Sequence, residues 1–296
     1  MVESIDNNRI KFEELDIEKD AEKIRLLTPI PDIPLHNAGA YKGVPVDVNS
    51  RENQENLVNL KDFGIRTVPY YLEQAQFNPT YKRNILEAPS IIYAREGVAR
   101  KMQLINKLLD RLSLELICYD AHRSPKTQLQ LFNCFIKIAN EKDLYGKEAR
   151  EFALQYCSDP AGFDRNNPNT WTIHATGGAV DVYLFDKRSR KVIDLGEKHF
   201  DNPTEPTHTR FYENINDRNM LRPKYDGFLK ARRVLYNAMT SGNDTFINFG
   251  YEVFHYSYKD PYYALIKGEH AKYGYKDEPK EKAYTQMLAN FLSQTR

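Results

Sequence analysis

Two short segments of the sequence combine histidine, acidic residues and glycine in an arrangement that could bind a metal ion. In the first, His174 precedes the pair Gly177-Gly178 and Asp181 follows it. The two glycines allow the chain to reverse sharply, so the imidazole and the carboxylate can converge on one point. Imidazole nitrogen and carboxylate oxygen are both usual zinc ligands. An aspartate in the middle of an apolar strand is also costly unless it is paired or bound to a cation.

The second segment, Glu252-Val253-Phe254-His255, supplies a third candidate ligand and a candidate base. His255 would complete a set of three protein ligands that leaves one zinc position open for water, as a hydrolase needs. Residues an odd number apart on a regular strand point to opposite faces, so Glu252 and His255 cannot both serve one site from a regular strand. We therefore expect Glu252 to lie at a bend, with Gly250 as its cause, where its carboxylate could act as general base.

Each of these features also has an ordinary structural interpretation. A histidine beside two glycines is commonly a surface residue, a strand aspartate commonly lies at an edge, and a Glu-x-x-His spacing occurs by chance. The three cysteines, Cys118, Cys134 and Cys157, offer no convincing alternative metal site, because no two of them have the C-x₂-C spacing of thiolate zinc sites. We interpret them as free thiols in a reducing compartment.

The elements that must position these residues follow from the pattern of apolar side chains. Segments rich in β-branched and aromatic residues predict strands over 114–120, 179–186, 191–195 and 249–258. Alternation along the second of these strands predicts one face with Asp181, Tyr183 and Phe185 and an opposite face with Val180, Val182 and Leu184. The candidate ligand Asp181 is thereby expected to share its face with aromatic rings.

Helices are predicted where apolar residues recur at three- and four-residue steps. One begins at Ser124-Pro125, a typical N-cap followed by proline at the first helical position, with Leu129, Phe132 and Phe135 facing inward. The other predicted helices cover about 17–26, 96–113, 146–157, 226–242 and 279–294. Helices in the first half and strands in the second indicate an α+β fold with a mostly antiparallel central sheet flanked by helices.

Composition limits the classes of partner. The chain has 296 residues, of which 41% are hydrophobic and 28% charged, enough for a substantial core. Lys and Arg total 42 against 41 Asp and Glu, so the net charge of +1 gives no reason to expect nucleic acid or an anionic membrane as partner. No run approaches the roughly 20 apolar residues of a membrane span.

The organisation of the chain indicates one catalytic domain with an extension. Residues 1–50 have few aromatic residues and contain closely spaced prolines, so we expect an N-terminal extension that packs on the body. Residues 51–296 contain no linker or repeat and are expected to form the catalytic domain. The first 30 residues lack a secretory signal, which favours the cytoplasm. A periplasmic location is the alternative if a signal peptide has been removed.

The candidate metal segments resemble the zinc signature of the D-alanyl-D-alanine dipeptidases, the VanX-type branch of the LAS metallopeptidases. The signature here is His174-x-x-Gly177-x-Ala179-x-Asp181 followed by Glu252-x-x-His255. Three further segments resemble the family in order and spacing: Tyr119-Asp120-Ala121-His122-Arg123, Leu195-Gly196 with Phe200-Asp201, and Arg233-x-Leu235-x-x-Ala238-Met239. The resemblance covers about residues 56–258 and implies a LAS-type zinc peptidase fold.

The resemblance implies a metal and a base. His174, Asp181 and His255 would hold one Zn²⁺ per chain. Glu252 would take a proton from zinc-bound water and deliver it to the leaving amine.

It also implies residues that contact the substrate. Arg123 would stabilise the oxyanion of the tetrahedral intermediate, with Asp120 orienting it. Asp201 would receive the free amino group of the substrate, and Thr172, at the family's serine position, would hydrogen-bond the substrate. A carboxylate that selects a free amine would make the enzyme a dipeptidase.

The sequence departs from the family pattern near the substrate. Val253-Phe254 replaces a Trp-Trp pair, and the loop from Gly196 to Phe200 is one residue longer. The ligands, the base and the arginine are all retained, so the expected function is hydrolysis of D-Ala-D-Ala or a related D,D-dipeptide in peptidoglycan metabolism. The alternatives are a D,D- or L,D-carboxypeptidase or endopeptidase acting on peptidoglycan stem peptides, and a non-catalytic binding module.

Overall fold

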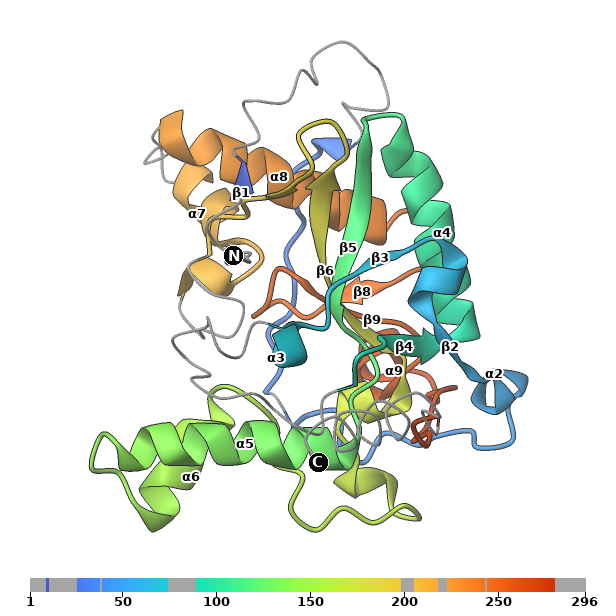
Figure 1. Ribbon diagram of the computed structural model, residues 1–296, viewed down its shortest axis with the longest axis vertical. Helices are drawn as coiled ribbons and strands as arrows, with labels where there is room; N and C mark the ends of the chain where they lie inside the picture. The colour runs from blue at the N-terminus through green and yellow to red at the C-terminus, as the bar shows by residue number, and fades with distance from the viewer. Residues whose placement is uncertain are drawn as a thin grey trace, which may run out of the picture.

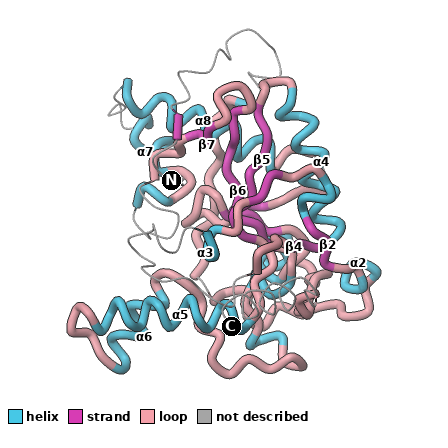
Figure 2. The backbone as a smooth tube through the Cα atoms, viewed as in Figure 1, coloured by secondary structure: helices cyan, strands magenta, loops and turns pink. Residues whose placement is uncertain are grey.

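Helices surround a central, mostly antiparallel sheet in the computed structural model (Figures 1 and 2). The structure describes residues 9–10, 26–37, 39–73, 89–197, 205–217, 223–242 and 244–279. The strands in these ranges are β1 (Arg9–Ile10), β2 (Leu57–Asn59), β3 (Arg66–Thr67), β4 (Tyr93–Arg95), β5 (Leu114–Asp120), β6 (Ala179–Asp186), β7 (Lys191–Ile193), β8 (Ile247–Asn248) and β9 (His255–Ser257). The α-helices are α2 (Arg51–Gln54), α3 (Tyr70–Glu73), α4 (Glu96–Asp110), α5 (Pro125–Asn140), α6 (Gly146–Leu154), α7 (Phe211–Asp217), α8 (Pro223–Met239) and α9 (Pro261–Lys267). The prediction of a mixed fold with a mostly antiparallel sheet is therefore confirmed.

The register of three neighbouring strands brings acidic and histidine residues side by side. The main sheet has the order β1-β7-β6-β5-β3, and β9 pairs with β6 on the same side as β7 and carries β8 at its outer edge. Across the antiparallel pairs, Asp120 of β5 lies opposite Asp181 of β6, and Asp181 lies opposite His255 of β9. The β5–β6 register shifts between Cys118 and Asp120, which indicates a bulge where Asp120 joins this row.

The predicted strands over 114–120 and 179–186 match β5 and β6. The strand predicted over 191–195 starts at the same residue as β7 but ends two residues later. The predicted strand over 249–258 is wrong. Only His255–Ser257 pairs as a strand, because the backbone before it forms turns in which the Glu252 N–H donates to the Phe249 carbonyl at 2.7 Å. The aromatic residues that suggested a strand instead pack ring against ring: Phe249 lies 5.4 Å from Tyr251, centroid to centroid.

The predicted helices are present where the structure describes the chain. The Ser124 hydroxyl accepts a hydrogen bond from the Thr127 N–H at 3.2 Å and so caps α5. Phe132 and Phe135 are buried as predicted, but Leu129 is 46% exposed and Leu131 is buried in its place. α5 and α6 lie together at one end of the molecule (Figure 1). The helices predicted near 17–26 and over 279–294 lie almost wholly outside the described residues.

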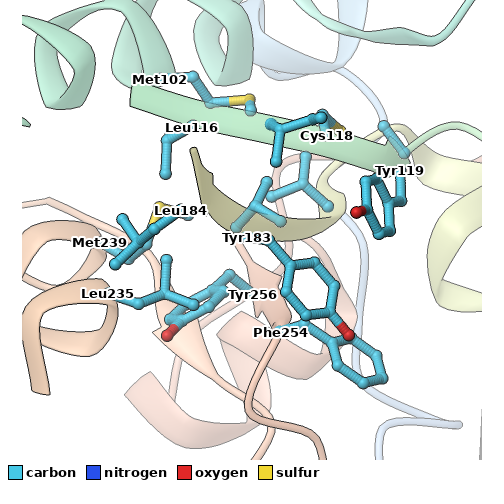
Figure 3. Close-up of a cluster of buried hydrophobic side chains, with 14 of the residues drawn as sticks. Met102, Leu116, Cys118, Tyr119, Tyr183, Leu184, Leu235, Met239, Phe254 and Tyr256 are labelled. Carbon is cyan, nitrogen blue, oxygen red and sulfur yellow. The ribbon is translucent and has the colours of Figure 1, made fainter. Parts of the chain in front are cut away.

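The two faces of β6 differ as alternation predicts. Val180, Val182 and Leu184 are fully buried in the core. Figure 3 shows Leu184 close to Leu235 and Met239 of α8, on the side of the sheet covered by helices. This face of the strand serves packing.

The opposite face of β6 is aromatic next to the acidic row. The Tyr183 ring lies 4.9 Å from the Tyr119 ring and stacks 5.7 Å from Phe254 (Figure 3). Asp181 belongs to the same face, since it lies two residues before Tyr183. The candidate ligand therefore lies on a strand that is fixed from both sides.

The described parts of the N-terminal extension contact the body, and β1 within it pairs with β7 in parallel. Leu26 and Ile30 are buried, and the Ile30 N–H donates to the Glu213 carboxylate on α7 at 2.9 Å. Further along, Val46 forms a bridge with Ala271.

None of the three cysteines forms a disulfide, as the sequence analysis predicts. Within the described ranges, no helix has the length and apolar character needed to cross a membrane.

Candidate metal centre

A 3₁₀ turn followed by β6 positions the first candidate ligand. His174 lies in the 3₁₀ helix Ile173–Thr176, which ends at Gly177 with φ of +72°. A residue with a side chain is strained at this angle, and a Cβ here would also lie 2.6 Å from Leu57. The sharp turn allows His174 to point back towards the strand that begins at Ala179.

A backbone contact sets the tautomer of His174. Its Nδ1 lies 2.7 Å from the Ala121 carbonyl oxygen, which can only accept, so Nδ1 carries the hydrogen. Nε2 is then the nitrogen with the lone pair, and it lies 3.5 Å from Asp181 Oδ2. Hydrogen bonding of one ring nitrogen to a carbonyl is the usual support for a histidine that binds metal through the other.

The hairpin β8–β9 positions the second half of the site. His255 opens β9, and its Nδ1 lies 3.0 Å from Asp181 Oδ1. Glu252 lies in the turn before β9, at the bend that the sequence analysis expects. Its Oε2 is 3.7 Å from His255 Nδ1.

Three side chains offer ligand atoms to one point. Atoms of His174, Asp181 and His255 all lie within 4.8 Å of one another, and all three residues are buried. Although His255 Nδ1 lies 3.0 Å away, the buried Asp181 Oδ1 accepts no hydrogen bond from the described residues, which is costly in the absence of a cation. Two imidazoles and one carboxylate form a donor set that suits zinc, so these residues fit the metal that the sequence analysis expects.

Burial shifts the pKa values of all three candidate ligands towards their neutral forms. Burial, reinforced by the positive charge of Arg123, lowers the pKa of His174 well below its usual value, and burial lowers the pKa of His255. Burial and the neighbouring Asp120 carboxylate raise the pKa of Asp181 well above its usual range. A metal ion binds imidazole in its neutral form, and a bound cation would favour the ionised form of Asp181.

Glu252 differs from the three candidate ligands in exposure and pKa. Its side chain is 35% exposed, whereas the side chains of His174, Asp181 and His255 are at most 10% exposed. Burial raises its pKa to about 7, against the opposing effect of His255. A carboxylate with this pKa can both accept and release a proton near neutral pH.

A dense set of hydrogen bonds fixes Arg123 beside the centre. Its Nε donates to Asp120 Oδ2 at 2.8 Å, and Nη2 donates to the same oxygen and to the Tyr71 hydroxyl at 2.9 Å. Its Nη1 donates to Gln128 Oε1 at 2.9 Å, and Nη2 lies 3.8 Å from Asp181 Oδ2. A guanidinium has five N–H groups, so one hydrogen on Nη1 has no acceptor among the described residues.

Sequence reasoning found Arg123 and Asp120 but gave no role to Gln128 or Tyr71. Gln128 is 1% exposed, and its Nε2 donates to the Ser158 carbonyl at 2.7 Å, which fixes its oxygen towards Arg123. In the sequence, Gln128 could have been found as a polar residue on the buried face of α5. The prediction that Leu129 faces inward instead places Gln128 away from this face.

Of the two remaining residues expected to bind the substrate, Thr172 and Asp201, the structure describes only Thr172. Thr172 precedes the 3₁₀ turn, and its hydroxyl is buried without a hydrogen-bond partner in the part of the chain that the structure describes. Asp201 lies outside the described residues.

The fold and the site define a mixed helix and sheet protein with a buried His–Asp–His group that could hold a metal ion. Comparison with known proteins adds no family: no protein-family profile matches the chain, and no curated protein matches it.

Proposed function

We propose that this protein is a zinc-dependent peptidase that hydrolyses D-Ala-D-Ala or a related D,D-dipeptide. The observation that carries the proposal is the buried group His174, Asp181 and His255 with Glu252 and Arg123 beside it. A base and a fixed cation next to three ligands supply the parts that hydrolysis of an amide requires. The resemblance to the D-alanyl-D-alanine dipeptidases supports the choice of substrate.

His174, Asp181 and His255 would hold the zinc ion, one per chain. When bound, the zinc would act as a Lewis acid that polarises the carbonyl of the scissile bond and lowers the pKa of the attacking water. The Glu252 carboxylate accepts a proton from the attacking water. It then donates this proton to the nitrogen of the leaving amine. Its pKa of about 7 suits both transfers.

Arg123 stabilises the negative charge that develops on the carbonyl oxygen. Its remaining Nη1 hydrogen is the donor for this oxyanion. Asp120 and Gln128 hold the guanidinium in place, so little reorganisation is needed when the charge forms. This arrangement explains why the arginine is buried with its own counter-ion.

Two further residues are proposed to bind the substrate. The Thr172 hydroxyl, which is buried without a partner among the described residues, would hydrogen-bond the substrate. Asp201 would bind the free amino group, a role that rests on the resemblance alone. We place the activity in the cytoplasm, where cysteines outside disulfides, like the three of this chain, are typical and where free dipeptide can be recycled.

The test is incubation of purified, zinc-loaded protein with D-Ala-D-Ala, L-Ala-L-Ala, N-acetyl-D-Ala-D-Ala and a pentapeptide stem, with released amino acids measured. We expect turnover of D-Ala-D-Ala and at least about 5- to 150-fold slower turnover of the acetylated peptide. An acylated amine would leave the Asp201 carboxylate without a partner, at a cost of about 1–3 kcal/mol. Equal rates for both would favour the carboxypeptidase, and no hydrolysis of any peptide would refute the peptidase.

A further inference from the structure

One buried side-chain amide holds both ends of the turn that carries Glu252 and His255. Asn248 Nδ2 donates to the carbonyl oxygen of Glu252 at 3.1 Å and to that of His255 at 3.0 Å. Asn248 is the second residue of β8, pairs with Tyr256 of β9 and is 5% exposed. This one amide thus links the backbone of the candidate base to that of the candidate ligand.

A second buried residue sets the orientation of this amide. The Thr209 hydroxyl donates to Asn248 Oδ1 at 2.6 Å, and Thr209 is fully buried. A flipped amide would face its oxygen towards two carbonyl oxygens, none of which can donate a hydrogen. The observed orientation is therefore the one that satisfies both carbonyls and the hydroxyl.

The turn also has backbone hydrogen bonds, because the Phe249 N–H donates to the His255 carbonyl at 3.0 Å and the Glu252 N–H donates to the Phe249 carbonyl at 2.7 Å. The His255 N–H donates to the Glu252 carbonyl at 3.2 Å, and the Val253 N–H donates to the Thr207 carbonyl at 3.0 Å. The Thr209 N–H also donates to the Gly250 carbonyl at 3.0 Å. Thr209 thus contacts the turn through both its backbone and the amide of Asn248.

We propose that Asn248 is a positioning residue of the metal centre, oriented by Thr209, and that it sets the placement of His255 for zinc binding. Loss of the amide would remove one hydrogen bond from each end of the turn, so His255 Nδ1 could shift from its position 3.0 Å from Asp181 Oδ1. Partners that support metal ligands from outside typically contribute 10–100-fold in affinity. The proposal concerns metal binding alone and therefore stands independently of the peptidase activity.

The chain contains a matched control in Asn237 of α8. Its Nδ2 also donates to two backbone carbonyls, those of Leu26 at 3.0 Å and Thr28 at 2.8 Å. These bonds tie the N-terminal extension to α8 and involve none of the candidate ligands. Asn237→Ala thus removes the same kind of interaction without touching the turn.

The experiment measures the zinc Kd of the full-length wild type, Asn248→Ala and Asn237→Ala by competition with a chromogenic chelator. Thermal melting of the zinc-free proteins reports stability. We expect the zinc Kd to rise about 10- to 100-fold in Asn248→Ala and to stay at the wild-type value in Asn237→Ala, although both lose stability. A folded Asn248→Ala protein with the wild-type zinc Kd overturns the proposal.

A second pair of variants decides the matter if Asn248→Ala does not fold. Thr209→Val removes the hydroxyl that orients the amide, and Thr209→Ser keeps it. We expect Thr209→Val to bind zinc more weakly than wild type and Thr209→Ser to bind like wild type. Equal zinc affinity of the Val and Ser variants contradicts the assigned role.

Discussion

The two segments that form the candidate metal centre are positioned by different means. His174 and Asp181 are seven residues apart, joined by one 3₁₀ turn with a left-handed Gly177 and the first residues of β6. Glu252 and His255 are only three residues apart, but their turn depends on hydrogen bonds from Asn248 and from residues 207–209. Short sequence distance is therefore a poor guide to which half of the site forms locally.

The second segment also packs closely against the N-terminal extension at Gly250. Gly250 does not adopt a positive φ, but a Cβ there would lie 2.8 Å from Leu35 and 3.0 Å from Ile33. The sequence predicts Gly250 as the cause of the bend, whereas in the structure its lack of a side chain allows close packing of the extension. The first segment should thus respond to changes in its own backbone and the second to changes in distant partners.

The largest effect on zinc binding is expected from removal of a candidate ligand in either of the two segments. His174→Ala and His255→Ala should each lose nearly all zinc, because two ligands remain from a set of three. Elemental analysis measures the metal, and a zinc-dependent rise in melting temperature should be present in wild type and lost in both variants. Stoichiometric zinc in either variant would remove that residue from the ligand set.

The next effect concerns a residue of the second segment that is not expected to bind the metal. Glu252→Gln should keep its zinc and lose about 10²–10⁴-fold in kcat, the usual contribution of a general base. Zinc content and D-Ala-D-Ala turnover are measured on the same sample. Loss of the metal from this variant would make Glu252 a ligand and change the mechanism.

A smaller effect is expected at Gln128, which contacts Arg123 and no candidate metal ligand. Gln128→Leu should lower kcat about 10-fold or more with zinc content unchanged, since a hydrogen bond to a charged group is worth about 1.5–3 kcal/mol. Gln103→Leu, on the exposed side of α4, is the control and should keep the wild-type kcat. An unchanged kcat in Gln128→Leu would show that Arg123 keeps its position without this bond.

The smallest effects are expected on stability, from alanine substitutions at Gly177 in the first segment and Gly250 in the second. Gly177→Ala should lower the free energy of unfolding by about 1–2 kcal/mol, because a left-handed backbone is strained for a residue with a Cβ. Gly250→Ala should lower it less, since the atoms it meets belong to the side chains of Leu35 and Ile33, which can move. Urea unfolding of the two variants gives both values. A larger loss in Gly250→Ala would reverse the comparison.

Sequence reasoning reaches furthest where the determining interactions are local. The apolar alternation of β6, the Ser124-Pro125 start of α5 and the turn at Gly177 each depend on a few neighbouring residues, and all three are present. The ligands His174, Asp181 and His255 could also be chosen in advance, because few residue types bind metals.

Only the tertiary structure decides the features that depend on long-range contacts. Residues 249–254 have the composition of a strand, yet they form turns because Asn248 and residues 207–209 supply hydrogen bonds that a ladder would otherwise provide. The inward position of Gln128 depends on the rotation of α5 against the sheet, which a one-residue error in the apolar pattern conceals. The sequence by itself therefore determined the chemical groups of the centre. Their geometry is decided by the register that aligns Asp120, Asp181 and His255, because strand pairing joins residues that are distant in the chain.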